Sequence, residues 1–295
     1  MTNNNTYDLI SRILIIILDN TLPNSDFFYD PVTAINEDAA KGKTAEIFED
    51  IRNTMNIPLI TSIWRGLASM DNSLEDIWLL TKPIYLSGTP ELALTNMINN
   101  INLPTPNINN HCKGIKKSDL IHIENIITAY NKSNGMNLMA LSALVMSEYK
   151  PRVAITNISS KILVPTFPRL RNKEEISPES WLKVKEVNSL GSSQGLDSHV
   201  ATLWRHLSYW PEFLTIVHDN FKSFHENGHL DKVFAEVLYY LNTNGINLRR
   251  QKIKYKNITN EALITIKNYV SMPNQVIRMV VLGNMTLRLI KNIKT

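Results

Sequence analysis

The sequence predicts an all-α protein built from two tandem, pseudo-symmetric helical modules. The segment Ile60–Ala68 is echoed by Val200–Ser208, and matching residues continue at the same offset of 140 positions as far as Asn102 and Asn242. An internal repeat of this length indicates two copies of one supersecondary unit. In both copies, apolar residues recur at the three- and four-residue spacing of one helix face. A β-like pattern occurs only over Val153–Val164.

The composition is that of a globular protein. The 295 residues are 43% hydrophobic, and a chain of this length can bury a large core. The net charge of +4 is small, and the many Asn, Ile and Lys residues are typical of AT-rich codons, so we expect no nucleic-acid partner. Cys112 is the one cysteine, which excludes an intramolecular disulfide, a Cys-x-x-Cys redox centre and a structural thiolate zinc site. A cytoplasmic location is therefore expected.

The N-terminal residues 1–35 are expected to form a helical extension. Their apolar run, Ile13–Leu18, is far shorter than the ~20 residues that span a bilayer. No small-residue cleavage site follows it, because Asp19–Pro23 is polar and turn-like. We predict a packing helix and no membrane span, with a signal anchor as the alternative.

The first module is expected over residues 36–155. Its repeat helix covers 59–70, and Gly88 ends the next helix because glycine readily adopts the left-handed conformation of a helix cap. Residues 102–117 contain two prolines and several asparagines, which predicts a loop. Further helices are expected over 90–100, 118–130 and 137–149.

A linker is expected over 156–178, where Pro165–Arg169 is typical of extended chain. The second module then covers 179–295. Pro211 suits the first position of a helix, and Gly228 repeats the helix-ending role of Gly88. Its helices are expected over 200–208, 230–242, 259–270 and 274–292.

One segment, His225-Glu226-Asn227-Gly228-His229, matches the H-E-x-x-H pattern of zinc proteases. That chemistry requires both histidines on one helical turn, with the glutamate as base. The Asn-Gly pair inside the motif ends helices, and the first copy of the repeat has an ordinary turn at Tyr85–Thr89. We therefore predict a turn and no metal, with zinc binding as the alternative.

Two other motifs also have plain interpretations. Gly191–Gly195 matches the G-x-S-x-G pattern of esterases, but that nucleophile requires a preceding strand, and a helical segment, Trp181–Leu190, stands there. A loop is therefore predicted. The basic run Leu248–Lys256 is short and contains one aromatic residue, so it predicts a solvated loop rather than a nucleic-acid site.

The repeat places a Trp-Arg pair in each module. Trp64 and Trp204 lie on the apolar faces, where aromatic side chains usually pack in a core. Arg65 and Arg205 point away from those faces, and two such arginines could bind a carboxylate. The alternative is a structural pairing with acids of a neighbouring helix, such as Glu46, Glu49 or Asp50.

Two segments of the sequence resemble the group I 2-haloacid dehalogenase family. One is Gly42-Lys-Thr-Ala-Glu-Ile-Phe-Glu-Asp-Ile-Arg52, which leads through Ile57-Pro58 into Trp64–Ala68. The other is Leu203-Trp-Arg-His-Leu-Ser-Tyr-Trp-Pro-Glu-Phe-Leu214. Together with the repeat, the resemblance covers roughly residues 35–290.

The resemblance implies an all-helical subunit in which two alkylhydroperoxidase-D-like modules form a pseudo-dimer with the active site between them. It implies that water displaces halide from a small 2-haloalkanoic acid, with no cofactor and no covalent ester. In that family an aspartate of the second module activates the water, and an asparagine on a first-module helix helps to place it. The peroxidases of the same fold use a Cys-x-x-Cys pair, which this chain lacks.

The resemblance also gives the candidate site residues. The family's aspartate falls on or near Ala201-Thr202-Leu203, where no residue is acidic, so the nearest acid, Asp197, is the candidate base. A helix N-cap is the plainer role for Asp197. The helper is sought among Asn131, Asn134 and Asn137. Candidate substrate contacts are Thr202, Arg65, Arg205, Trp64 and Trp204.

Three functions remain open at this point. The first is a cofactor-free haloacid dehalogenase acting on a small carboxylate substrate. The second is a non-catalytic homologue that binds a small apolar acid at the seam between the modules, which the missing carboxylate favours. The third is a structural or interaction protein. The sequence carries no metal, nucleotide or flavin motif, and a homodimer stays open.

Overall fold

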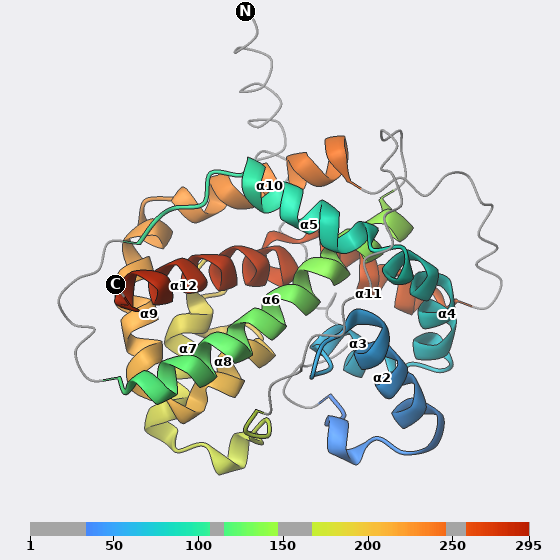
Figure 1. Ribbon diagram of the computed structural model, residues 1–295, viewed down its shortest axis with the longest axis horizontal. Helices are drawn as coiled ribbons and strands as arrows, with labels where there is room; N and C mark the ends of the chain where they lie inside the picture. The colour runs from blue at the N-terminus through green and yellow to red at the C-terminus, as the bar shows by residue number, and fades with distance from the viewer. Residues whose placement is uncertain (1–33, 107–114, 147–166, 246–257, 295) are drawn as a thin grey trace, which may run out of the picture.

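The computed structural model describes residues 34–106, 115–146, 167–245 and 258–294 of the chain, and these residues fold into helices without a strand. The all-α prediction is therefore confirmed (Figure 1). The α-helices are α2 (Gly42–Met55), α3 (Ser62–Leu67), α4 (Ser73–Leu86), α5 (Thr89–Asn100), α6 (Lys117–Val145), α7 (Pro178–Ser189), α8 (Thr202–His206), α9 (Pro211–Glu226), α10 (His229–Asn244), α11 (Asn260–Ser271) and α12 (Arg278–Lys294).

The long helix α6 runs through the middle of the molecule, with α12 on one side and α2 to α4 on the other (Figure 1). The sequence predicted two helices here, interrupted near Asn134-Gly135, whereas the structure has one. The glycine is retained for close packing: a Cβ at position 135 would overlap the side chain of Leu94 in α5. Packing on every side of α6 therefore outweighs the helix-breaking tendency of the Asn-Gly pair.

Helices α3 to α5 and α8 to α10 follow one another in the same order in the two halves of the chain. Gly88 precedes α5 and Gly228 precedes α10, with φ angles of 69° and 72°. Both lie in the left-handed region that glycine enters without a steric cost. The predicted breaks at these two glycines, and the predicted start of α9 at Pro211, are confirmed.

The C-terminal helices include a kink. Helix α11 matches its predicted range, but the last helix begins at Arg278 rather than at residue 274. A π-helical turn, Pro273–Ile277, lies between them, and Gln275 has non-helical backbone angles within it. Proline opens the turn, where its missing N–H group costs nothing.

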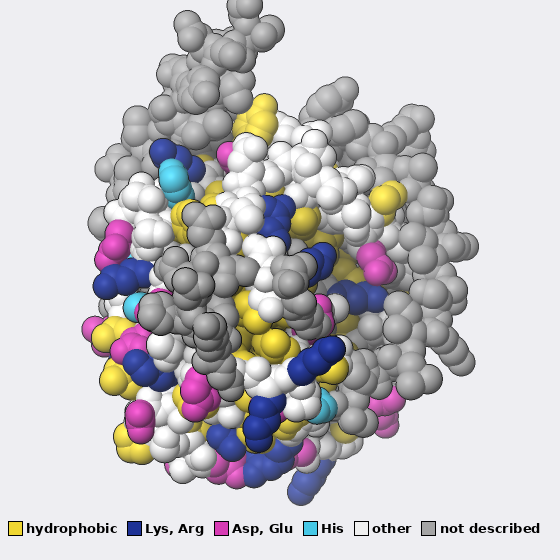
Figure 2. All heavy atoms as spheres, turned by 60° about the vertical axis from the view of Figure 1, so that its left-hand side comes forward, with side chains coloured by type: hydrophobic (Ala, Val, Ile, Leu, Met, Phe, Trp, Pro, Cys, Tyr) yellow, Lys and Arg dark blue, Asp and Glu magenta, His cyan; other side chains and the backbone are white. Residues whose placement is uncertain are grey.

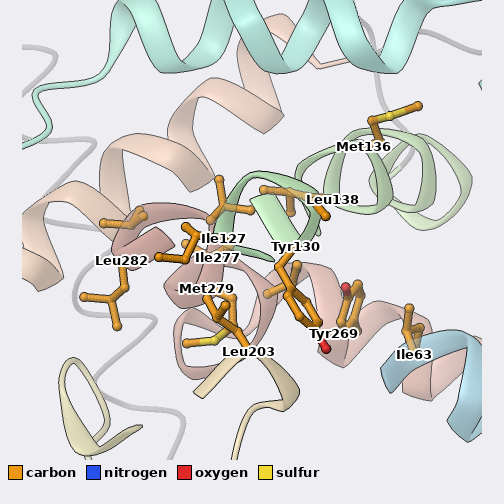
Figure 3. Close-up of a cluster of buried hydrophobic side chains, with 14 of the residues drawn as sticks. Ile63, Ile127, Tyr130, Met136, Leu138, Leu203, Tyr269, Ile277, Met279 and Leu282 are labelled. Carbon is orange, nitrogen blue, oxygen red and sulfur yellow. The ribbon is translucent and has the colours of Figure 1, made fainter. Parts of the chain in front are cut away.

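The core is continuous from the first half of the chain to the second. Trp64, Trp78 and Tyr85 pack edge to face or tilted, with ring centroids 5.5 to 6.3 Å apart. Figure 3 shows part of the same buried cluster, in which Tyr130 of α6 lies among side chains from α3, α8, α11 and α12. Buried aromatic rings of this kind supply much of a core's apolar surface.

The surface is mixed in charge. On the face shown in Figure 2, lysine and arginine side chains occur together with aspartate and glutamate, and hydrophobic side chains are visible in the middle of the face. No helix of the described segments is long and apolar enough to cross a bilayer. Several sequence predictions fall outside the described residues, namely those for Ile13–Leu18, Cys112, Val153–Val164 and Leu248–Lys256.

Candidate functional site

Two side chains from the two halves of the chain meet in the interior. Arg65, on α3, donates from Nη2 to Thr202 Oγ1, on α8, across 2.9 Å. Both side chains are buried, and Arg205 is buried on the same helix as Thr202. The structure thus brings together three of the predicted substrate contacts, Arg65, Thr202 and Arg205, in a buried region between the halves that we call the seam.

The acids that were the alternative partners of Arg65 pair with other cations. Glu46 lies 3.7 Å from the ammonium group of Lys43, and Glu49 forms an ion pair with Arg52. Asp50 accepts hydrogen bonds from Lys82 Nζ and from the indole N–H of Trp78.

The other amino group of Arg65 is directed at the backbone. Its Nη1 donates to the carbonyl oxygens of Ala34 and Ile35, each at 3.3 Å. Together with Thr202, these carbonyl groups fix the position of the Arg65 guanidinium within the seam.

A tyrosine–histidine pair lies in the same region. Tyr130 Oη, on α6, is 3.2 Å from Nδ1 of His206, at the end of α8. The other ring nitrogen of His206, Nε2, lies 2.7 Å from the carbonyl oxygen of Pro168. The ring of Phe167 packs edge to face on His206, at a centroid distance of 6.2 Å. A hydrogen-bonded path therefore runs from α6 through α8 to the segment after residue 166.

Burial and charge set the protonation states of this pair. Burial, opposed by the Pro168 hydrogen bond and reinforced by the charge of Arg205, lowers the pKa of His206 to about 4. Burial raises the pKa of Tyr130 above its ordinary value, while the charges of Arg65 and Arg205 act to lower it. Both groups are therefore neutral at pH 7, and both guanidinium charges lie close enough to act on Tyr130.

One half-buried carboxylate lies close to these groups. Glu37 accepts hydrogen bonds from the backbone N–H of Ile60, at 2.8 Å, and from Arg52, at 3.0 Å. Burial raises the pKa of Glu37, whereas those two hydrogen bonds and the charge of Arg65 act to lower it. Both carboxylate oxygens are occupied, so this residue fixes the 3-10 turn Glu37–Ala39 against α2 and the start of α3.

Asn137 is the centre of a polar network in the first half of the chain. Its Oδ1 accepts from Trp64 Nε1 at 3.2 Å and from Tyr85 Oη at 2.9 Å. Its Nδ2 donates to Thr61 Oγ1 at 2.9 Å, and Thr61 is 3.3 Å from Ser133 Oγ. A buried amide with all these partners satisfied is structural, and it explains why the indole of Trp64 is held firmly in the core.

Other buried polar atoms have no hydrogen-bond partner within the described segments. They include Trp204 Nε1, Thr265 Oγ1 and both amide atoms of Asn131. The Asn131 side chain lies against Gly283 of α12, where an added Cβ would overlap it. Asn134 is also buried on α6. Buried polar groups are normally satisfied, so these atoms are candidates for contact with a ligand or water.

The candidate base lies apart from the buried cluster. Asp197 ends the 3-10 turn Gly195–Asp197, and its side chain is exposed, whereas Asn131, Thr202 and Arg205 are buried. Asp197 does not cap α8, because the N-cap residue of that helix is Ala201.

The loop that leads from Asp197 into α8 is fixed by one asparagine. Asn188, on α7, donates from Nδ2 to Ser198 Oγ at 2.9 Å and to the carbonyl of His199 at 3.1 Å. Its Oδ1 accepts the backbone N–H of Ala201 at 3.0 Å. The buried guanidinium of Arg278, at the start of α12, donates to the carbonyl oxygen of Asn188. Burial lowers the pKa of Arg278 to about 10.

The two enzyme-like motifs have the structures of turns. Helix α9 ends at Glu226 and α10 begins at His229, so the helix breaks inside the H-E-x-x-H pattern. His225 Nδ1 accepts the backbone N–H of Gly191 at 3.2 Å. Within the described ranges, no group of three or more His, Cys, Asp and Glu side chains could hold a metal ion. The G-x-S-x-G segment follows helix α7, not a strand.

The sequence reasoning missed Tyr130, His206 and Glu37. One signal for His206 was present, because the two copies of the repeat differ at this position: the first has Gly66 and the second has His206. A large polar side chain in place of glycine at the end of an apolar helix indicates a role that the first copy does not have.

The overall fold is similar to that of solved D-2-haloacid dehalogenases. A D-2-haloacid dehalogenase mutant matches with a TM-score of 0.62 at 13% identity, over 89% of this chain and 96% of that chain. A mutant complex with D-2-CPA matches with a TM-score of 0.60 at 12% identity, over 88% and 95%. A complex with L-LA matches with a TM-score of 0.57 at 13% identity, over 88% and 95%. No protein-family profile and no curated sequence matches the chain.

Proposed function

We propose that this chain is a group I type 2-haloacid dehalogenase homologue that removes halide from a small 2-haloalkanoic acid with an activated water. The similarity to D-2-haloacid dehalogenases extends over nearly all of both chains, which supports the same arrangement of helices around the seam. We also propose that residues 36–155 and 179–295 are the two alkylhydroperoxidase-D-like modules of a pseudo-dimer. The repeated helix order and the paired glycines at 88 and 228 support this division.

The observation that carries the proposal is the contact of Arg65 with Thr202. It places a guanidinium group and a hydroxyl group together where the two halves of the chain meet, with Arg205 on the same helix as the hydroxyl. Guanidinium groups bind carboxylates through charge-assisted hydrogen bonds. Leu203, next to Thr202 on α8, and Met279 belong to the buried apolar cluster that contains Tyr130, and apolar side chains of this kind suit an alkyl group and a halogen.

The remaining roles follow from the resemblance and from the unsatisfied polar atoms. Asn131 or Asn134 would help to place the water, and the amide of Asn131 has no partner within the described segments. Trp204 would offer its indole N–H to the substrate, while Trp64 would contribute apolar surface because Asn137 occupies its N–H. Asp197 is the proposed base in this scheme.

A second function is favoured by one specific observation. Asp197 is exposed, and residues 201 to 203 carry no acid. A chain that keeps the acid-binding side chains but lacks a water-activating group would bind a small apolar carboxylic acid without turning it over.

The test is to measure chloride release from racemic 2-chloropropionate by the wild-type chain and by Asp197→Asn. Binding of the unreactive analogue propionate is measured by NMR on the same preparations. For the dehalogenase we expect chloride release by the wild type together with propionate binding. An acid-binding homologue would bind propionate without releasing chloride. Folded protein that neither binds propionate nor releases chloride would contradict both functions.

A further inference from the structure

The direction of the hydrogen bonds at His206 is fixed by the carbonyl group of Pro168. A carbonyl oxygen can only accept, so Nε2, 2.7 Å away, carries the proton. In the neutral imidazole, Nδ1 therefore has a free lone pair, and the hydroxyl of Tyr130 donates to it across 3.2 Å. Since its one proton is used, Tyr130 Oη offers only lone pairs to any other molecule.

This oxygen lies close to the groups proposed to bind the substrate. Tyr130 Oη is bonded to His206, which lies on the same short helix as Thr202 and Arg205, and Arg65 contacts Thr202 directly. In a 2-haloacid the reacting carbon is bonded to the carboxyl carbon. A carboxylate held by these arginines therefore has its reacting carbon beside an oxygen that accepts hydrogen bonds, which is where a nucleophilic water must be held.

We infer that Tyr130 takes a proton from the attacking water and passes its own proton to Nδ1 of His206, so that this pair replaces the carboxylate that is missing near the start of α8. The inference rests on the proposed dehalogenation, and it assigns the water-activating role to this buried pair instead of to the exposed Asp197. In this step Tyr130 is the catalytic residue, because it takes the proton from the water, and His206 is a positioning residue that acts through Tyr130.

The step balances without a further reactant. The water oxygen forms a bond to the substrate's second carbon as the carbon–halogen bond breaks, and the halide leaves with the bonding electrons. The water gives one proton to Tyr130 Oη, and the phenolic proton moves to His206 Nδ1. After the hydroxy acid leaves, the proton returns through Tyr130 to solvent, and the net products are the hydroxy acid, halide and a proton.

The surroundings of His206 set its strength as a proton acceptor. Burial and the charge of Arg205 both disfavour the protonated imidazole, whereas the hydrogen bond to the carbonyl of Pro168 stabilises the protonated form. The resulting pKa of about 4 is close to the ~3.9 of an ordinary aspartate. Around Tyr130 the charged groups are Arg65, Arg205 and Glu37. The pair therefore matches the basicity of the carboxylate that it replaces, and it is unprotonated at pH 7.

The test compares chloride release and propionate binding in the wild type, Tyr130→Phe and His206→Asn. The asparagine variant places an oxygen acceptor near the position of Nδ1 but has no basicity. Tyr85→Phe is the matched control, because Tyr85 is equally buried and its hydroxyl is bonded to Asn137.

We expect both Tyr130→Phe and His206→Asn to lower kcat by ~100-fold or more, the usual contribution of general base catalysis. The dissociation constant of propionate should change by less than about threefold, because acid binding is assigned to other residues. Tyr85→Phe should keep most of its rate. In the wild type, kcat should fall as the pH approaches about 4, the pKa of His206. The residual rate of His206→Asn should not show this fall at low pH.

Two results would overturn the inference in distinguishable ways. Chloride release that survives Tyr130→Phe but disappears in Asp197→Asn would assign the base to Asp197 and leave the proposed function intact. A wild-type chain that binds propionate and releases no chloride would show that the pair accepts no proton from water. A wild-type chain that does neither would contradict the proposed function itself.

Discussion

Arg65 Nη2 and Thr202 Oγ1 lie 2.9 Å apart, and this hydrogen bond joins a helix of the first half of the chain to a helix of the second. Sequence distance gives no indication of it, because the two residues are 137 positions apart. The contact is buried. If the hydroxyl of Thr202 were removed, the guanidinium group would lose an acceptor that water could not easily replace.

Thr202→Val should therefore destabilise the protein by about 1–3 kcal/mol, the cost of leaving a buried donor unsatisfied. Thr265→Val is the matched control, since Thr265 is also buried and its hydroxyl has no partner within the described segments. That control should be neutral or slightly stabilising. Urea unfolding of both variants measures the difference, and equal effects would show that the Arg65 contact contributes nothing.

Gly283→Ala should destabilise the protein by about 1–3 kcal/mol, because overpacking forces side chains and backbone to shift. The new methyl group would overlap the amide of Asn131. Removing that amide should restore the space, so Asn131→Ala combined with Gly283→Ala should be more stable than Gly283→Ala alone. Thermal unfolding of the two single variants and the double variant tests this coupling; simple additivity would show that the two positions do not touch.

Stability should fall in acid because of His206. Its pKa is about 4 in the folded state and 6.5 ordinarily, so between these values the unfolded chain binds a proton that the folded chain does not. Unfolding therefore becomes easier as the pH falls from about 6.5 to about 4, by up to about 3 kcal/mol at ~1.4 kcal/mol per pKa unit. His206→Asn lacks this titration. The difference in unfolding free energy between wild type and variant should therefore shrink over that range, and a constant difference would contradict the prediction.

Trp64→Phe should be more destabilising than Trp204→Phe by about 1 kcal/mol, the typical net value of one hydrogen bond. Both indoles are fully buried, but within the described segments only the indole N–H of Trp64 has an acceptor, Asn137. If Trp204 instead donates to the ligand, its replacement should weaken propionate binding and leave stability less affected. Denaturation and NMR titration of the same two variants separate these effects.

The helices and most of their ends could be predicted because the signals are local. Apolar spacing, Pro211 and the glycines before α5 and α10 each act within a few residues. The continuity of helix α6 could not be predicted, because it depends on the close fit of Gly135 against Leu94, a residue of another helix.

The site was predictable only in part for the same reason. Arg65 and Arg205 were found through the repeat and Thr202 through the family resemblance, and the structure brings them into one buried region. Tyr130 and His206 were missed, because their partnership arises only when α6 lies across α8. Asp197 is exposed because it ends the short 3-10 turn Gly195–Asp197, and no sequence motif predicted that turn.

Helix α6 has a consequence for how the protein is made. It packs extensively on α12, the last described helix, as well as on α5. During synthesis, α6 leaves the ribosome long before α12 exists, so its apolar side stays uncovered until translation is almost complete. A truncation that removes α12 would therefore expose the middle of the molecule rather than trim its edge, and neither half of the chain is expected to form a stable fragment alone.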